Sequence, residues 1–194
     1  VDPHRFGFDE DGPEVVLLSS PSQYSKDGKA HFEVTADDHG GIGLDRMEYQ
    51  VDDGIGESFN WFQFGGILDL TNLQDGVHKI FIRALDLKGN IGEAKFVQWT
   101  VDNGKPVLTL NGKPADPTVS TVANFSYSAT DTHDNAPTFK NCFLDSVPLD
   151  DCDGQTSVAN LAPAFYTFKV TAVDKAGNET SIKYDFTVLE SDGD

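Results

Sequence analysis

Ala84–Asn90 reads Ala-Leu-Asp-Leu-Lys-Gly-Asn and Ala172–Asn178 reads Ala-Val-Asp-Lys-Ala-Gly-Asn, so an Asp-x-x-Gly-Asn box occurs twice, 88 residues apart. A second landmark, Ala30–Ala36, returns as Ala123–Ala129 at an offset of 93 residues. The difference of five residues falls between the landmarks, where a loop absorbs a change of length at little cost in free energy. The sequence therefore predicts a tandem array in which one structural unit is written twice.

The residues that lead into each box alternate with a period of two. One side of the first copy holds His78, Ile80, Ile82 and Ala84, and the same side of the second holds Tyr166, Phe168, Val170 and Ala172. This period is typical of a half-buried β-strand. No window sustains a helical period, and clusters of Gly, Pro, Asn and Asp interrupt the chain every eight to twelve residues or so.

These patterns predict an all-β fold made of two tandem immunoglobulin-like β-sandwich domains joined by a short linker, since each copy has roughly the length of such a domain. The expected boundaries are an extension or linker at 1–12, a first domain at 13–102, a second at 103–190 and a tail at 191–194. No run approaches the roughly 20 apolar residues that span a bilayer, and the N-terminus lacks a signal-like apolar core. We expect a piece of a longer protein that does not itself insert into a membrane.

The composition is strongly acidic. The chain has 14 Lys and Arg against 32 Asp and Glu, a formal net charge of −18. Such a charge repels phosphate backbones and anionic membrane surfaces, so no nucleic acid partner is expected. The acidity serves solubility, or it gathers carboxylates in loops to hold a hard cation, which prefers six to eight oxygen ligands.

Cys142 and Cys152 are the two cysteines, both in the second copy. Their spacing favours a disulfide across adjacent strands or between a strand and its loop, which points to an oxidising compartment. A pair of reduced buried thiols is the alternative. A redox or metal site fits less well, because the spacing is not Cys-x-x-Cys and no His lies in the segment.

These residues carry a family resemblance. The second copy has Cys142-x-Leu144-Asp145, Cys152 and Asn160-Leu161 before its box, and the first has Tyr49-x-Val51-Asp52-x-Gly54, Trp61 and Asp75-Gly76-x-His78. In this pattern the chain, from about Pro13 to Val188, resembles bacterial immunoglobulin-like repeats of large secreted or surface-anchored proteins. The resemblance implies spacers, stalks, adhesin segments or accessory domains of exported enzymes. Pro163–Phe165 departs from the usual Asp-Gly turn, which puts the geometry of that turn in doubt.

An immunoglobulin-like sandwich places the chain entry, the loop after its second strand and the turn after its sixth at one end. Oxygen-bearing residues at this end are Asp102, Asn103, Asp131, Asp134 and Asp174 for the second domain, and Asp11, Asp37, Asp38 and Asp86 for the first; all but Asn103 are acidic. Crowded carboxylates repel one another unless a cation intervenes. We therefore predict a calcium ion at this end of each domain, the second one stiffening the joint.

Simpler roles exist for the same residues. Asp86 and Asp174 can bond the amides of their own Gly-Asn turns. His39 and His133 share one loop position and suggest zinc, although one His with carboxylates makes a poor zinc site. His78 is expected to bond the backbone, as the tyrosine of a tyrosine corner does, and Tyr166 replaces it in the second copy.

The aromatic segment Phe59–Phe64 is the candidate for ligand contact through Trp61, Phe62 and Phe64, because exposed aromatic rings stack on sugars or fill a partner's pocket. Packing against the core is the competing interpretation. Alternation makes either Phe59 and Trp61 or Phe62 and Phe64 the outward pair.

Catalysis finds little support, since no Gly-x-Ser-x-Gly, His-Glu-x-x-His or phosphate loop occurs. We expect no enzyme but an extender or stalk segment of a large extracellular or cell-surface protein, with neighbouring immunoglobulin-like domains as its partners. The linker 101–106 is short and contains Pro106, which favours this reading because it restricts the motion of the two domains. The alternative is a recognition module for a cell-surface glycan or protein, or an accessory domain of a secreted enzyme.

Overall fold

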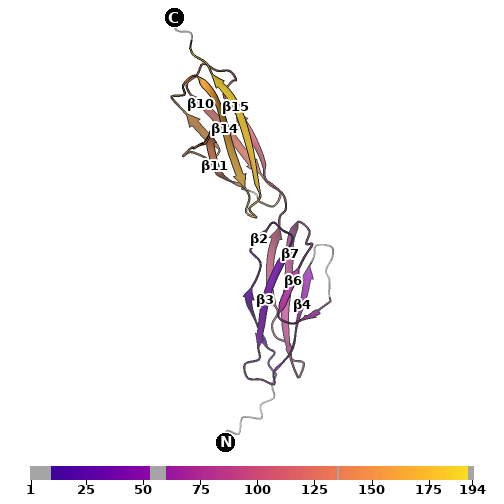
Figure 1. Ribbon diagram of the computed structural model, residues 1–194. Helices are drawn as coiled ribbons and strands as arrows, with labels where there is room; N and C mark the ends of the chain where they lie inside the picture. The colour runs from indigo at the N-terminus through magenta and orange to yellow at the C-terminus, as the bar shows by residue number, and fades with distance from the viewer. Residues whose placement is uncertain (1–9, 53–59, 135, 192–194) are drawn as a thin grey trace. The chain divides into compact units, whose positions relative to one another are not determined.

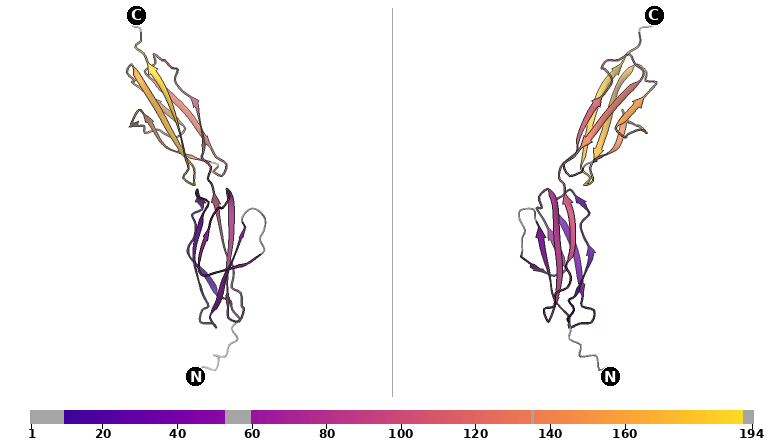
Figure 2. Two further views of the ribbon diagram at one scale, coloured as in Figure 1. Left: turned by 45° about the vertical axis from the view of Figure 1, so that its right-hand side comes forward. Right: turned by 180° about the vertical axis from the view of Figure 1, so that it is seen from behind.

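The computed structural model describes residues 10–52, 60–134 and 136–191, and these form strands and turns without a helix (Figure 1). None of them therefore builds a helix long and apolar enough to cross a membrane. The chain divides into two compact units, Val1–Asn103 and Gly104–Asp194. The predicted all-β architecture is confirmed, and in each unit two sheets face one another (Figure 2).

The described residues of unit 1 form eight strands in two sheets. The strands are β1 (Glu14–Ser19), β2 (Tyr24–Ser25), β3 (Ala30–Asp37), β4 (Leu44–Asp52), β5 (Phe62–Phe64), β6 (Ile67–Leu70), β7 (Gly76–Asp86) and β8 (Lys95–Val101). One sheet has the order β1-β3-β6, and the other has the order β2-β8-β7-β4-β5. All pairs are antiparallel except β2 with β8.

The core of unit 1 lies between these sheets and follows from the period of two. In β7 the inward positions include Ile80 and Ile82, both fully buried, while the positions between them face outward. Phe32 from β3 meets Trp99 from β8 edge-to-face with ring centroids 5.5 Å apart. These rings come from opposite sheets, so their contact closes the sandwich.

Unit 2 repeats this plan, with seven strands among its described residues. They are β9 (Val107–Gly112), β10 (Ala123–Thr130), β11 (Thr138–Leu144), β12 (Val147–Pro148), β13 (Gln155–Val158), β14 (Ala164–Val173) and β15 (Glu179–Val188). The sheets have the orders β13-β10-β9 and β12-β11-β14-β15. Phe125 of β10 stacks on Phe168 of β14 at 3.8 Å between centroids, and Phe186 of β15 packs edge-on against Phe125.

The strand registers set which ends of unit 1 carry the chain entry and exit. Strand β1 begins opposite Asp37, which ends β3, and β4 begins opposite Asp86, which ends β7. Strand β8 ends opposite Gly76, which begins β7. The chain therefore enters at the end that holds the β3–β4 loop and the β7–β8 turn, as predicted, and leaves at the other end.

Unit 2 has the same polarity. Strand β9 begins opposite Thr130, which ends β10, and β11 begins opposite Val173, which ends β14. Strand β15 ends opposite Ala164, which begins β14. Entry and exit lie at opposite ends of this sandwich too.

Candidate functional site

The Asp-x-x-Gly-Asn box is a self-contained turn in both units. Asp86 Oδ1 accepts hydrogen bonds from the amides of Lys88 and Asn90 at 2.8 Å each, and Oδ2 accepts from Asn90 Nδ2 at 2.7 Å. Asp174 Oδ1 accepts from the Asn178 amide at 2.8 Å, and Oδ2 from Asn178 Nδ2 at 2.9 Å. The spacing of the box is thus explained by its side chains closing the turn.

The hydrogen bonds also determine the charge state of the Asp86 carboxyl group. Burial raises the pKa of Asp86, but the hydrogen bonds from the amide and side chain of Asn90 and from the amide of Lys88 outweigh it, and the pKa lies below its usual value. The carboxylate is therefore charged and satisfied without a cation. Asp86 and Asp174 therefore bond the amides of their own turns, which is the structural role that the sequence also allowed. Their role as calcium ligands stays a prediction.

The other predicted ligands of unit 1 lie at the same end. Asp37 Oδ1 accepts from the His39 amide at 2.9 Å, and Asp38 Oδ2 accepts from the Gly43 amide at 2.6 Å. Asp11 is exposed. Among the residues of unit 1 that the structure describes, Asp11, Asp37, Asp38 and Asp86 do not form a cluster of three convergent carboxylates. The prediction of a calcium ion at this end of unit 1 therefore rests on the sequence alone.

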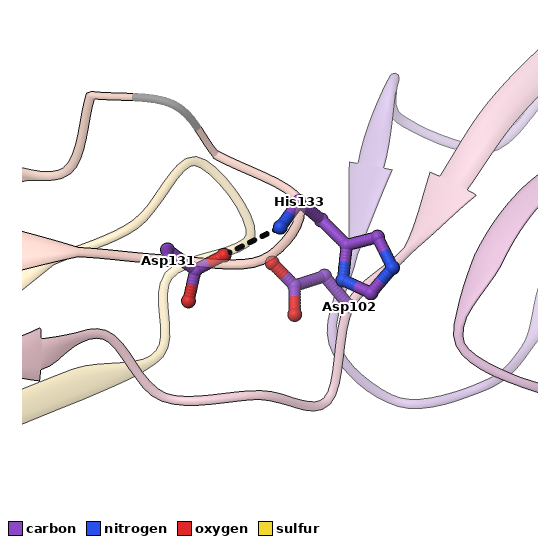
Figure 3. Close-up of side chains that lie close together, drawn as sticks. All are labelled: Asp102, Asp131 and His133. Atoms are coloured by element: carbon purple, nitrogen blue, oxygen red, sulfur yellow. Dashed lines mark hydrogen bonds between the residues drawn. The ribbon is translucent and has the colours of Figure 1, made fainter.

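In unit 2, two aspartates organise the loop after β10. Asp131 Oδ1 accepts from the amides of His133 at 2.8 Å and Asp134 at 3.0 Å, and Figure 3 shows the first of these bonds. Asp134 Oδ1 accepts from the Ala136 amide, and Oδ2 from the Lys175 amide, both at 3.1 Å. The ammonium of Lys175 lies 3.1 Å from Asp134 Oδ1. The loop is thereby tied to the turn after β14.

Asp134 is buried and nevertheless charged. Burial raises its pKa, but the hydrogen bond from the Ala136 amide and the adjacent Lys175 ammonium outweigh burial, so the pKa lies below its usual value. Asp131 differs, because both amides reach the same oxygen, Oδ1. Its Oδ2 is the carboxylate oxygen in this loop best placed to accept a further partner.

Asp102 and Asn103, also predicted as ligands, follow the last strand of unit 1. The Asp102 amide donates to the Ser25 carbonyl at 2.8 Å. Asn103 donates from its amide and from Nδ2 to Asp75 Oδ1, at 2.9 and 2.7 Å. Both residues are thus held by unit 1, and their part in metal binding stays a prediction.

The predicted disulfide is confirmed. Cys142 of β11 and Cys152 of the loop before β13 are joined, with their Cα atoms 5.6 Å apart. Cys142 is buried, and its Sγ lies 3.1 Å from the hydroxyl of Tyr127, which also bonds Thr156 Oγ1 at 2.8 Å. The disulfide therefore fastens the loop before β13 to the core of unit 2.

The two corner residues also match the prediction. Tyr166 donates its hydroxyl to the Ala162 carbonyl at 2.9 Å, and His78 Nε2 lies 2.7 Å from the Gln74 carbonyl. Each bond reaches four residues back along the chain. His78 is 2% exposed and stacks against Trp99. A histidine thus fixes in unit 1 the corner that a tyrosine fixes in unit 2.

The aromatic segment divides between two faces of the sheet. Phe62 and Phe64 lie on the side of Tyr49, with ring centroids 5.7 and 5.6 Å from it, and Phe64 packs against the core while Phe62 is 49% exposed. Trp61 lies on the opposite, outer side, where the guanidinium carbon of Arg83 is 3.9 Å from its ring centroid. Phe59 lies outside the described residues. Ligand binding by Trp61, Phe62 and Phe64 stays a prediction.

Sequence reasoning missed two further aromatic residues on this outer face. Phe81 of β7 pairs with Phe96 of β8, their ring centroids are 5.1 Å apart, and both rings are exposed. Next to them Arg83 donates from Nε and a terminal nitrogen to Glu48 Oε2 at 2.9 and 2.7 Å. A strand-by-strand alignment of the two copies would have found them, because the second copy has other residues at these positions.

Glu48 is the buried anchor of this network. Its Oε1 accepts from Arg46 Nε at 2.7 Å while Oε2 accepts from Arg83. Burial raises the pKa of Glu48, but the hydrogen bonds from Arg46 and Arg83 outweigh burial and bring the pKa below its usual value. A carboxylate that is 8% exposed is costly unless paired, so the two guanidinium groups account for its position.

One surface cleft of unit 1 is lined by His31, Asp69 and Ser25, three residue types that form catalytic triads in hydrolases. His31 Nδ1 lies 2.7 Å from Asp69 Oδ1, and its Nε2 faces Glu33 Oε1 at 3.5 Å. The Ser25 hydroxyl donates to Asp27 at 2.9 Å. His31 thus faces two carboxylates while the Ser25 hydroxyl is bonded to Asp27, so these contacts do not pair the serine with the imidazole as an activated nucleophile requires.

No family model matches the sequence, and no match is found among curated proteins either. Solved structures do resemble it. The fibronectin(III)-like modules of CbhA from Clostridium thermocellum share 13% identity over 91% of this chain and 95% of that chain, with a TM-score of 0.51. Extracellular domains 3–5 of Drosophila OTK share 12% identity over 92% of this chain and 62% of that chain, with a TM-score of 0.53. At such identities the likeness shows the fold alone, a β-sandwich of the immunoglobulin and fibronectin type III kind.

Proposed function

We propose that this chain is a non-catalytic extender segment of an extracellular or cell-surface, adhesin-like protein. The observation that carries the proposal is the polarity of each unit, since the chain enters at one end of the sandwich and leaves at the other. A unit of this kind adds its full length to a chain of modules. Each unit also has its own closed core and needs no partner to bury it.

The same polarity suits a segment under tension. Ladder hydrogen bonds of an antiparallel sheet run perpendicular to the strands. A force applied to the ends of a unit acts along its strands, so it loads many ladder bonds in shear at once. Strands β14 and β15 pair without interruption from Ala164↔Val188 to Val173↔Glu179, which is the longest ladder of unit 2.

Force spectroscopy on the whole chain, held by its two ends, tests the proposal. We expect two separate cooperative unfolding events in each extension. In the oxidised protein the residues between Cys142 and Cys152 stay looped, so reduction should lengthen one event by about 30 Å, the span of ten residues less the 5.6 Å between the Cα atoms. Smooth extension without cooperative events would refute the extender role.

The extracellular setting is supported by the disulfide. Such bonds persist in oxidising compartments and are rare in the cytosol of most organisms. Neighbouring immunoglobulin-like domains are the partners that the extender role requires. The redox state of the two cysteines in the native protein, measured by alkylation and mass spectrometry, checks the setting, and two free thiols would count against it.

We extend the proposal to calcium at the entry end of unit 2. Its support is the loop carboxylate of Asp131, whose Oδ1 accepts both amides, together with the nearby carboxyl groups of Asp134 and Asp174. A cation that binds only the folded state must raise the melting temperature. We expect calcium at millimolar concentration to raise the melting temperature of unit 2, and Asp131→Asn to reduce the effect. An unchanged melting temperature with calcium against a chelator would exclude the ion.

A further inference from the structure

The outer face of the sheet β2-β8-β7-β4-β5 carries an exposed aromatic surface, here called the aromatic face and defined by Trp61, Phe81, Phe96, Arg83 and Gln50. Register places Gln50 of β4 opposite Phe81 of β7, and Phe81 opposite Phe96 of β8. Phe81 is 38% exposed and Phe96 is 51% exposed. Adjacent strands lie about 4.8 Å apart, so these side chains form a row across the sheet.

The Trp61 end of the aromatic face is held rigidly. Arg83 lies over the indole ring at 3.9 Å, and two hydrogen bonds fix its guanidinium on Glu48. Glu48 is in turn held by Arg46. A ring oriented in this way loses little conformational entropy when a ligand stacks on it.

Unit 2 shows that the fold does not require this surface. The cross-strand pair equivalent to Phe81 and Phe96 is Lys169 and Lys183. The equivalent of Glu48 and Arg83 is the pair Asn141 and Thr171. Because the same sandwich forms with lysines at these positions, the two exposed phenylalanine rings of unit 1 are not explained by folding. Exposed apolar surface grouped in this way marks an interaction site.

The charge of the aromatic face selects the class of ligand. Arg46 and Arg83 are balanced by Glu48 and Asp45, and Lys79 lies opposite Asp52. The face is therefore close to neutral on a chain of net charge −18. A second copy of the chain or an anionic polymer would meet long-range repulsion, whereas an uncharged ligand would not.

We propose that the aromatic face binds an uncharged oligosaccharide. A pyranose ring offers an apolar C–H side that stacks on Phe81, Phe96 and Trp61, and hydroxyl groups that can bond the neighbouring Gln50 and Arg83. Polar side chains of Gln50, Arg83 and Glu48 border the rings, and this mixed surface suits a sugar, which has both apolar and hydroxyl-bearing sides, better than a wholly apolar protein segment. The proposal does not depend on the extender role, because a stalk unit can carry a binding face or lack one.

Titration of the whole chain with neutral hexasaccharides of glucose, N-acetylglucosamine, galactose and mannose tests the proposal. The chain has two tryptophans, and Trp99 is 1% exposed, so a ligand on the aromatic face should change the fluorescence of Trp61 alone. At least one neutral hexasaccharide should give a saturable change that calorimetry reproduces. Trp61→Phe should remove the optical signal while calorimetry still detects binding.

The test variant is Phe81→Lys with Phe96→Lys, which installs the residues that unit 2 carries at these positions. It should weaken binding about tenfold or more, as truncation of an aromatic anchor does. Phe165→Lys in unit 2 removes a phenylalanine that is 63% exposed and should leave binding unchanged. Circular dichroism confirms that each variant is folded, and if the double variant were not folded, Trp61→Ala would take its place.

Three results would overturn the inference. The first is that none of the four neutral hexasaccharides binds. The second is that one binds with the same affinity to the wild type and to the folded double variant. The third is that sedimentation shows self-association of the wild type that the double variant abolishes, which would make the face a contact between copies.

Discussion

Reduction of the disulfide is expected to destabilise unit 2 by about 2.7 kcal/mol and to leave unit 1 unchanged. Cys142 and Cys152 are separated by 10 residues. In the chain-entropy account, a closed loop of this length removes about 9 cal/mol/K from the unfolded ensemble, which is about 2.7 kcal/mol at 25 °C. Reduction removes no side-chain heavy atom, so it removes the constraint without deleting volume from the core.

Scanning calorimetry of the oxidised and reduced chain measures this loss. For a domain of this size, each kcal/mol shifts the melting temperature by roughly 4–8 °C, so the transition of unit 2 should fall by roughly 10–20 °C. Unit 1 contains no cysteine and serves as the reference within the same sample. The double variant Cys142→Ala, Cys152→Ala should lose about 1 kcal/mol more, because Cys142 is buried and the substitution leaves a small cavity.

Two results would refute this reasoning. Equal shifts of both transitions would show that the units do not unfold separately. An unchanged transition for unit 2 would show that the segment between the cysteines is already ordered in the unfolded chain, so that the disulfide removes no entropy from it.

Three further predictions follow from individual contacts. Tyr166→Phe should lower the stability of unit 2 by about 1 kcal/mol, and His78→Phe should lower that of unit 1 by about the same amount. The reason is that each change deletes a hydrogen bond from the side chain to a backbone carbonyl. Unchanged midpoints in urea denaturation would contradict this. The hydrogen bonds to Asp69 and then to Glu33 raise the pKa of His31, so these contacts stabilise unit 1 below the ordinary pKa of 6.5, and this stabilisation is lost as the pH rises through the folded-state pKa. Asp69→Asn should reduce the shift in an NMR titration of the ring, and an unchanged shift would contradict the role of Asp69. Glu48→Gln should destabilise unit 1 by about 1–3 kcal/mol near pH 7, because the charged hydrogen bonds from Arg46 and Arg83 are lost. The pKa of Glu48 in the folded state lies below 4.5, so the advantage of the wild type should disappear as the pH falls through that pKa. Equal stability of the two proteins in urea denaturation at pH 7 would argue against the network.

Much of the fold can be predicted from the sequence, because its signals are local. Apolar residues that alternate with a period of two up to Ala84 and Ala172 mark the long strands β7 and β14. The Asp-x-x-Gly-Asn boxes that follow close their own turns through hydrogen bonds between Asp and Asn. Strand β2 could not be predicted. It consists of Tyr24–Ser25 paired with the end of β8, and two residues are too few to show a period.

The candidate sites divide in the same way. The spacing of Cys142 and Cys152 favours a disulfide because both lie in one short segment. The Phe81–Phe96 pair depends instead on the register of two strands, which a single pass along the chain does not reveal. Whether an aspartate such as Asp86 binds a cation or its own turn depends on the direction of its carboxylate, and residue spacing does not specify that direction.

The central claim is that the chain consists of two self-sufficient copies of one sandwich. Amide NMR spectra of the separate fragments 1–103 and 104–194, compared with the spectrum of the whole chain, test it most directly. We predict that each fragment gives a dispersed spectrum in which most peaks coincide with peaks of the whole chain. A collapsed, narrow spectrum from either fragment would contradict the claim.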